Sequence, residues 1–93
     1  MGWEEERANR QKLSREKGAI CKDWGGKISV ALIYPNLYFV GMSSLGFQTI
    51  YGLLNDFHQV VCERVFYPEL SHLQIVSLES SRPLMDFSIL AFS

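Results

Sequence analysis

The sequence predicts an α/β fold in which parallel strands are buried between helices. Two apolar runs rich in β-branched residues, Ile28–Ile33 and Val60–Phe66, predict buried strands. Between them, a loop with proline and glycine leads into a helical pattern from Leu45 to Phe57, as in the first half of a βαβ unit. Ligands of open α/β folds bind at the carboxyl ends of the strands, so loop 34–46 is the expected functional surface.

Composition limits the class of protein. The chain has 93 residues, enough for at most one small domain, and its 47% hydrophobic and 13% aromatic content is typical of a globular protein. A net charge of −1 argues against nucleic-acid capture. No secretory segment is present, and no apolar run approaches the ~18 residues of a membrane span. We therefore expect a cytoplasmic protein without nucleic-acid or membrane partners.

The two cysteines give no metal or redox signature. Cys21 and Cys62 lie far apart and lack CxxC spacing. The position of Cys62 in the second apolar run predicts a buried strand residue.

Charge divides the chain into two parts. Residues 1–27 hold seven Lys/Arg and five Asp/Glu, whereas residues 28–93 hold two and five. Trp3–Lys17 reads as a polar helix supported by charge pairs three and four residues apart. We predict a charged N-terminal helical arm over 1–27 and an α/β domain over 28–93.

The first strand and the helix after it have clear limits. We expect the strand near 28–34 to end at Pro35, because proline cannot donate to a strand ladder. Ser43 and Ser44 are alternative N-caps for the following helix. The residues at helical spacing, expected to face the core, are Phe47, Ile50, Tyr51, Leu54 and Phe57.

The second half predicts three further strands. The strand near 60–66 carries Glu63 and Arg64, which point to opposite faces and cannot pair with each other. A short turn follows around Glu69–Leu73, and then a strand near 75–79 that adds to an edge or forms a hairpin. Pro83 opens a helical turn before a last apolar strand near 88–93. The predicted order of the main strands is 2-1-3.

The last strand leads to two expectations about the whole molecule. A central parallel strand needs a helix over each face, and no such helix follows it in this sequence. We therefore expect this chain to be the front part of a longer protein. We also expect the 93-residue chain to be dimeric or prone to aggregation through the exposed sheet.

Several ordered fragments resemble a known family. They are Tyr34-Pro-Asn36, Tyr38, Val40-Gly-Met-Ser43, Leu45-Gly-Phe47, Glu63-Arg-Val-Phe66, Ser77-Leu-Glu-Ser80, Arg82-Pro-Leu84 and Ala91-Phe-Ser93. They resemble the N-terminal region of a group of radical SAM proteins often described as Fe–S oxidoreductases. The resemblance implies a flavodoxin-like, cobalamin-binding-type domain, a partial three-layer parallel sheet that precedes a radical SAM barrel. It also implies a parent enzyme with a [4Fe–4S] cluster and S-adenosylmethionine.

The chain departs from that family's chemistry at two places. The CxxxCxxC cluster motif is absent, so we expect this chain to be iron-free and not itself catalytic. The DxHxxG signature that ligates cobalt is replaced by Tyr38-Phe-Val-Gly-Met42. Either cobalamin binds without a histidine ligand from this loop, or the domain has lost cobalamin and kept the fold.

The loop after the first strand supplies the candidate site. Ser43 and Ser44 at a helix N-terminus either hold an anion or cap the helix. Asn36, Tyr38 and Met42 either line a flat macrocycle pocket or belong to a loop that packs onto the sheet edge. A P-loop is excluded, because Phe47 stands where lysine is needed. The candidate cofactor-binding residues are Asn36, Tyr38, Gly41, Met42, Ser43, Ser44 and Gly46.

Two functions follow from these observations. The first is a non-catalytic domain that faces the cofactor or substrate of a radical SAM enzyme, with the rest of its own parent chain as partner. The second is an interaction or oligomerisation module without a small-molecule ligand. A standalone nucleotide-binding protein is a weaker third hypothesis, because no phosphate motif is present. No Ser-His-Asp or Cys-His set and no selected carboxylate pair indicates catalysis.

Overall fold

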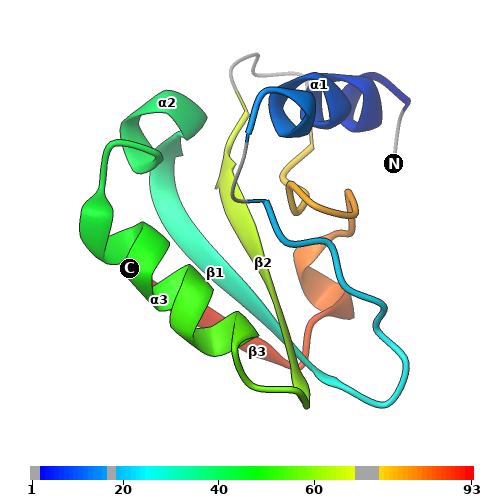
Figure 1. Ribbon diagram of the computed structural model, residues 1–93. Coiled ribbons are helices and arrows are strands. Elements are labelled where there is room, and N and C mark those ends of the chain that lie inside the picture. The colour runs from blue at the N-terminus through cyan, green and yellow to red at the C-terminus, as the bar shows by residue number, and fades with distance from the viewer. Residues whose placement is uncertain (1–2, 17–18, 69–73) are drawn as a thin grey trace.

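The computed structural model describes residues 3–16, 19–68 and 74–93. Its elements are α1 (Trp3–Ser14), β1 (Ile28–Leu37), α2 (Tyr38–Gly41), α3 (Leu45–Asn55), β2 (Val60–Tyr67), the 3-10 turn η1 (Leu84–Asp86) and β3 (Ile89–Phe92). The three strands form one parallel sheet in the order β2-β1-β3, with α3 against it and α1 beyond the end of β2 (Figure 1). The predicted α/β class and strand order are confirmed.

Strand β1 continues past its proline. Residues Ile28 to Tyr34 pair in register with β2, and the register then shifts before Leu37 pairs with Tyr67. The irregularity spans Pro35, which has no N–H to give to a ladder. Our prediction that Pro35 ends the strand was therefore wrong. The chain enters the short helix α2 at once, so part of the expected loop 34–46 is strand and helix.

Helix α3 packs its buried side on one face of the sheet. Ser44 is the N-cap, and its hydroxyl accepts a hydrogen bond from Phe47 N–H (3.3 Å). Phe47 and Tyr51 join a core with strand residues such as Val30, Leu32, Cys62 and Phe66. Cys62 is fully buried, as predicted. Ile50 and Phe57 were expected in this core but are exposed. Ile50 lies on a flank of the helix that the sheet does not cover, and the helix ends at Asn55, before Phe57.

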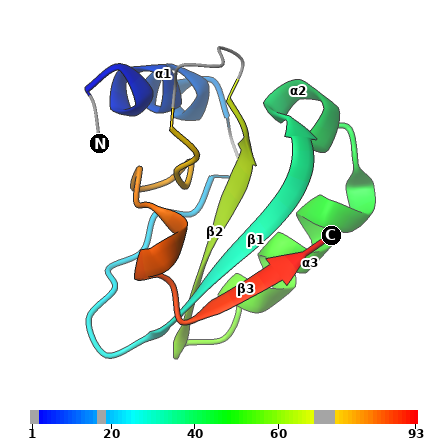
Figure 2. The same ribbon diagram turned by 180° about the vertical axis from the view of Figure 1, so that it is seen from behind.

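The opposite face of the sheet has its own small core. Ala31, Ile33, Val65 and Phe87 form it, and Trp24 and Leu84 pack against them. The rings of Trp24 and Phe87 meet edge to face at 4.8 Å. The segment before β1 and the turn η1 thus form the third layer, and η1 confirms the helical turn predicted after Pro83. Figure 2 shows β3 in front of β1 with no described segment drawn across it.

The expected strand at 75–79 is not formed. Two isolated antiparallel bridges stand in its place, Val65 with Ser77 and Val76 with Pro83. The chain turns back on itself between them, with Ser81 N–H donating to Ser77 O (3.0 Å) and Ser81 at a φ of 56°. This tight return ends pairing after single bridges. The turn predicted around Glu69–Leu73 lies outside the described residues.

Helix α1 is held against this turn by polar contacts. Asn9 Nδ2 donates to Ser77 O (3.1 Å) and to Ser81 Oγ (3.0 Å), and Glu5 Oε2 accepts from Gln74 N–H (2.9 Å). The helix ends at Ser14, and Lys17, where we predicted its end, is not among the described residues. In the part of the chain that the structure describes, no helix has the length and apolar character to cross a bilayer.

The two outer edges of the sheet differ. Groups from outside the sheet bond to the free edge of β2: Lys22 Nζ to Val60 O (2.9 Å), Asn55 to Cys62 N–H and O (2.9 and 3.0 Å), Glu79 Oε1 to Arg64 N–H (2.9 Å), and Leu78 N–H to Arg64 O (2.8 Å). Within the described residues, β3 pairs with β1 alone. The edge at β2 is therefore closed and the edge at β3 is open.

Candidate functional site at the carboxyl edge of the sheet

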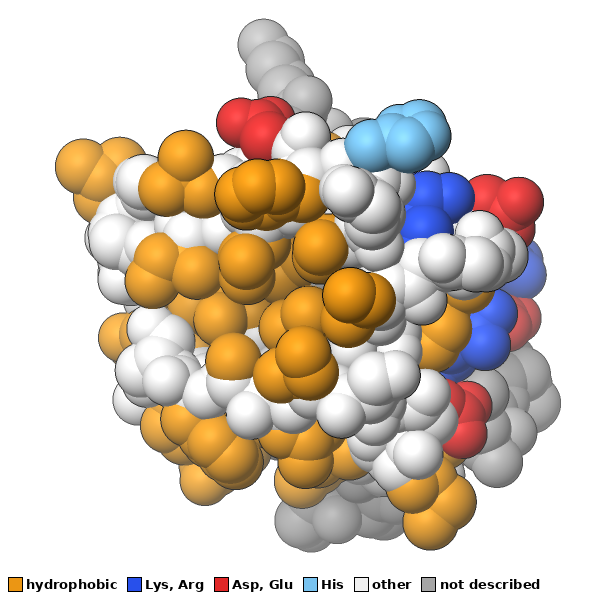
Figure 3. Space-filling view, turned by 90° about the horizontal axis from the view of Figure 1, so that it is seen from below, with side chains coloured by type: hydrophobic (Ala, Val, Ile, Leu, Met, Phe, Trp, Pro, Cys, Tyr) orange, Lys and Arg blue, Asp and Glu red, His pale blue; other side chains and the backbone are white. Residues whose placement is uncertain are grey.

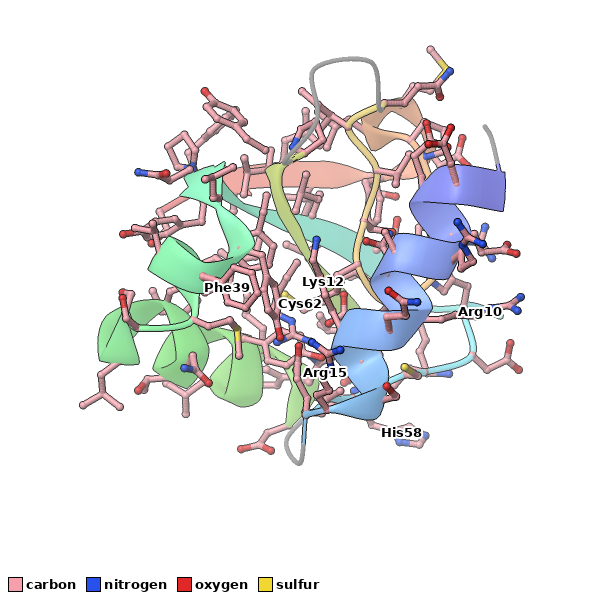
Figure 4. The ribbon with its side chains drawn as sticks, turned by 90° about the horizontal axis from the view of Figure 1, so that it is seen from above. Arg10, Lys12, Arg15, Phe39, His58 and Cys62 are labelled. Atoms are coloured by element: carbon pink, nitrogen blue, oxygen red, sulfur yellow. The ribbon has the colours of Figure 1, made fainter. Side chains whose placement is uncertain are left out.

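The carboxyl edge of the sheet brings α1, α2 and the end of β2 together. Strand β1 passes directly into α2, and Met42 to Ser44 connect α2 to α3. Figure 4 looks onto the molecule from above, and Lys12 extends from α1 toward α2. The Lys12 ammonium lies 5.3 Å from the centre of the Tyr38 ring. Most of the residues that the sequence proposed as a site lie here.

Tyr38 turns inward rather than toward solvent. It is buried, and its hydroxyl donates to Glu16 Oε2 (2.6 Å). Burial, reinforced by this hydrogen bond and by the charge of Glu16, raises the pKa of the Tyr38 phenol. The ring also lines a hollow of about 120 Å³ between α1 and the end of β2. Asn36, by contrast, is exposed, and its Oδ1 accepts from Leu37 N–H (2.7 Å).

The two glycines of the predicted set, Gly41 and Gly46, differ in whether there is room for a side chain at their position. A Cβ on Gly41 would stand 2.3 Å from an atom of the Phe66 ring and 3.3 Å from the Tyr34 ring. Gly41 is thus needed for α2 to approach β2 closely. A Cβ on Gly46 would meet nothing within 4 Å, so packing places no such demand there.

The two serines make local bonds at helix ends. Ser43 Oγ donates to Val40 O (2.6 Å) at the end of α2, and Ser44 Oγ caps α3. The sequence left open whether these serines cap the helix or bind an anion. In the structure, Ser44 caps α3. Contact of either serine with a ligand stays a prediction.

Met42 leads to a buried cluster around Arg64. This arginine is 1% exposed, and its Nε donates to Glu79 Oε2 (2.6 Å). Its Nη1 donates to Glu16 Oε1 (2.9 Å) and lies 3.5 Å from Met42 Sδ. The guanidinium carbon lies 4.2 Å from the centre of the Tyr51 ring, a cation–π contact. The cluster connects α2, α3, β2, the turn at 79 and the arm.

Electrostatics in this cluster favour a charged arginine. Burial alone would lower the pKa of Arg64, but the carboxylates of Glu79 and Glu16 outweigh it and raise the pKa. Burial raises the pKa of Glu79, and the neighbouring Arg64 opposes that rise. Arg64 Nη2 is buried without a hydrogen-bond partner among the described residues. The arrangement holds segments of the domain together.

Glu63 serves the other face of the sheet. Its Oε2 accepts from Trp24 Nε1 (2.8 Å), and its Oε1 accepts from Ser77 Oγ (2.7 Å) and Ser80 Oγ (2.6 Å). Glu63 and Arg64 therefore point to opposite faces, as strand alternation predicts. Both neighbouring charges bond to the arm and to the turn at 77–80, from opposite faces of the sheet.

Four apolar side chains face outward from this edge, beside the exposed Asn36. We call them the carboxyl-edge patch: Leu37, Phe39, Val40 and Leu45, of which Phe39 is 66% exposed and Leu45 80% exposed. The set predicted from the sequence passed over these four residues and took Asn36, Tyr38, Gly41, Met42, Ser43, Ser44 and Gly46 instead. Their positions flanking the buried Tyr38 and Gly41 are the signal that would have found them.

The site offers no metal chemistry of its own. Within the residues that the structure describes, no group of three or more His, Cys, Asp or Glu is placed to hold a metal ion. The two cysteines, Cys21 exposed and Cys62 buried, are fewer than the thiolates that an iron–sulfur cluster uses. The residues present thus do not fit such a cluster.

Fold and site together define a parallel α/β domain with an apolar carboxyl edge and a buried ionic cluster. A family described as the N-terminal region of radical SAM proteins matches residues 46–93, slightly more than half of the chain. The chain belongs to this family. The match begins in α3 and includes Arg64, Glu79 and β3. No curated protein and no solved structure matches the chain.

Proposed function

We propose that this chain is the non-catalytic N-terminal domain of a radical SAM iron–sulfur enzyme. Its carboxyl-edge patch faces the catalytic part of the same protein, next to a cofactor or substrate. The observation that carries the proposal is the family match, since the family is by its description an N-terminal region. The [4Fe–4S] cluster and S-adenosylmethionine then belong to the other part of the protein, because this chain lacks the thiolates.

The structure of the carboxyl edge supports the choice of surface. Open α/β domains use this edge for ligands, and here Leu37, Phe39, Val40 and Leu45 expose apolar surface. Surface of this kind suits a protein wall or the flat face of a macrocycle. The polar groups of Tyr38, Ser43 and Ser44 make hydrogen bonds within the domain, so the edge offers mainly apolar contact, to which Asn36 adds an exposed amide.

The reading frame after Ser93 tests the main proposal. We expect it to continue into CxxxCxxC, and a stop codon there would overturn the assignment to the front of a radical SAM enzyme. Iron analysis of the longer protein, purified without oxygen, is the matched biochemical test.

We further propose that the domain binds cobalamin. The edge would hold it by apolar contact and not by a ligand to cobalt. The edge supplies no histidine to cobalt, since residues 38–42 read Tyr-Phe-Val-Gly-Met. Cobalamin would be held by Phe39, Val40 and Leu45. Titration with cobalamin should give a saturable change in its visible spectrum that Phe39→Asp abolishes. The matched control is Met85→Asp, at an exposed position on η1, which should leave the change intact.

A second function is favoured by the same apolar edge. If titration gives no spectral change, the domain is an interaction module whose edge binds protein alone. In that case Phe39→Asp should weaken association with the catalytic part, and Met85→Asp should not. Equal association of both variants with the catalytic part would reject the carboxyl-edge patch as the contact.

A further inference from the structure

A second apolar surface lies away from the carboxyl edge, along α3 and β3. Figure 3 views the molecule from below and shows a broad apolar area with charged side chains only at its margin. We call the part on the α3 face the α3–β3 surface: Ile28, Ile50, Leu53, Phe57 and Ile89, each between 42% and 60% exposed. The function proposed above does not involve these residues.

The helical part of this surface is one flank of α3. Asn55 bonds to the backbone of Cys62, which places its side of the helix next to β2. Ile50 and Leu53 lie three residues apart on the opposite side, and Phe57 follows just past the end of the helix at Asn55. That flank therefore faces away from β2, toward the part of the sheet where β3 lies.

The strand part lies on the same face of the sheet. Ile89 pairs in register with Val30, whose side chain is buried against α3. Paired residues of parallel strands point to the same face, so Ile89 also points to the α3 face. Ile28 shares that face, two residues before Val30 on β1. Sheet face and helix flank thus form two apolar walls that meet at an angle.

The sheet itself indicates the direction in which further structure belongs. Lys22, Asn55 and Glu79 close the outer edge of β2, whereas β3 is open among the described residues. Strands of parallel sheets are covered on both faces, usually by helices. Neighbouring helices pack with their axes about 8–10 Å apart. A helix at that distance from α3, on the side away from β2, would lie over β3.

We propose that the α3–β3 surface is covered by an amphipathic helix from elsewhere in the same radical SAM protein. The inference rests on the proposed function, since that function supplies the longer chain. The apolar side of the helix contacts Leu53 and Phe57 on one wall and Ile89 on the other. Its polar side faces solvent, because the surface is open on that side.

Thiol labelling of engineered cysteines tests this proposal. In a Cys21→Ser background, Leu53→Cys places a thiol on the surface. Gln48→Cys places one at an exposed position seven residues before Asn55, and therefore on the β2 side of the same helix. Leu53→Cys should label about tenfold or more slowly in the longer protein than in the 93-residue chain, because the covering helix must open first. Gln48→Cys should label at the same rate in both. Ile50→Cys is a second probe if the first variant folds poorly.

Two outcomes would overturn the proposal. Equal labelling of Leu53→Cys in both proteins would mean that no helix covers the surface. Protection in the 93-residue chain that grows with its concentration would mean that a second copy is the occupant. The test is separable from the proposed function: a longer protein that protects Leu53→Cys but binds no iron would keep this inference and reject the radical SAM assignment.

Discussion

Arg64 is the largest fully buried side chain in the described part of the chain. It connects β2 to Glu16 in the arm and to Glu79 after the return turn. Removing one partner of a buried ion pair leaves an uncompensated charge, which costs about 3–5 kcal/mol. Arg64→Met should therefore lower the free energy of unfolding by about that amount in urea denaturation.

The control for Arg64 is Arg10→Met. Arg10 pairs with Glu6 on the surface of α1, with 74% of its side chain exposed. Exposed pairs of this kind contribute less than about 0.5 kcal/mol. If both variants lost the same stability, the buried cluster would not have the role that we assign to it.

Gly41 is a test of close packing at α2. Gly41→Ala would place a methyl group 2.3 Å from the Phe66 ring, so α2 or the ring must shift. We expect a loss of about 1–3 kcal/mol, as in overpacked cores. Gly52→Ala in α3 meets nothing within 4 Å and should instead gain about 0.5–1 kcal/mol. Thermal unfolding of the two variants should show shifts of opposite sign; a stabilising Gly41→Ala would refute the packing account.

Cys62 predicts a pH dependence at alkaline pH. Burial raises the pKa of its thiol from 9.0 to about 12. Between these values the unfolded chain releases the thiol proton and the folded chain keeps it. The free energy of unfolding should thus fall as pH rises from 9 to 12, by up to about 1.4 kcal/mol per pH unit from this group. Cys62→Ala should remove that part of the slope, and an unchanged slope would contradict the assignment.

At the scale of elements, α3 stabilises β2 through one side chain. Asn55 exchanges hydrogen bonds with the N–H and C=O of Cys62 and is itself buried. Asn55→Ala would leave both backbone groups unpaired, at a cost of about 1–3 kcal/mol. The Cys62 amide should also exchange its hydrogen faster. Gln48→Ala, at an exposed position of the same helix, should change neither value; equal effects would remove Asn55 from the account of the β2 edge.

The elements also show what could be predicted from sequence. Apolar runs identified three parallel strands, and the spacing of Phe47 and Tyr51 identified the helix between two of them. The extension of β1 past Pro35 could not be predicted, because it depends on pairing between Leu37 and Tyr67. The prediction of a strand at 75–79 was wrong. Its β-branched residues suggest a strand, but the return turn at Ser81 limits pairing to single bridges.

The sequence predicted where loop 34–46 lies in the fold, but not which contacts its side chains make. Loop 34–46 does lie at the carboxyl edge, yet Tyr38 and Met42 point to the interior. Tyr38 contacts Glu16 and Met42 contacts Arg64, and the two residues of each pair are 22 positions apart in the sequence. No local pattern joins residues so far apart, so the buried cluster became visible only with the fold. Strand alternation did predict that Glu63 and Arg64 cannot pair with each other.

At the scale of the whole molecule, two apolar surfaces lie on different sides of one small domain. In our proposal the carboxyl-edge patch contacts the catalytic part and its ligand, and a helix covers the α3–β3 surface. A domain with both surfaces is suited to be part of a larger chain, where each becomes an internal contact. Its buried charges connect the arm, the sheet and the return turn to one another.

The most direct test of the account is the iron content of the longer protein that begins with this chain, set beside the iron content of the 93 residues alone. Both should be purified without oxygen and supplied with iron and sulfide. We predict a [4Fe–4S] cluster in the longer protein, with an electron paramagnetic resonance signal that S-adenosylmethionine alters, and no cluster in the 93-residue chain. A longer protein without a cluster, or a cluster bound by the 93 residues alone, would contradict the central claim.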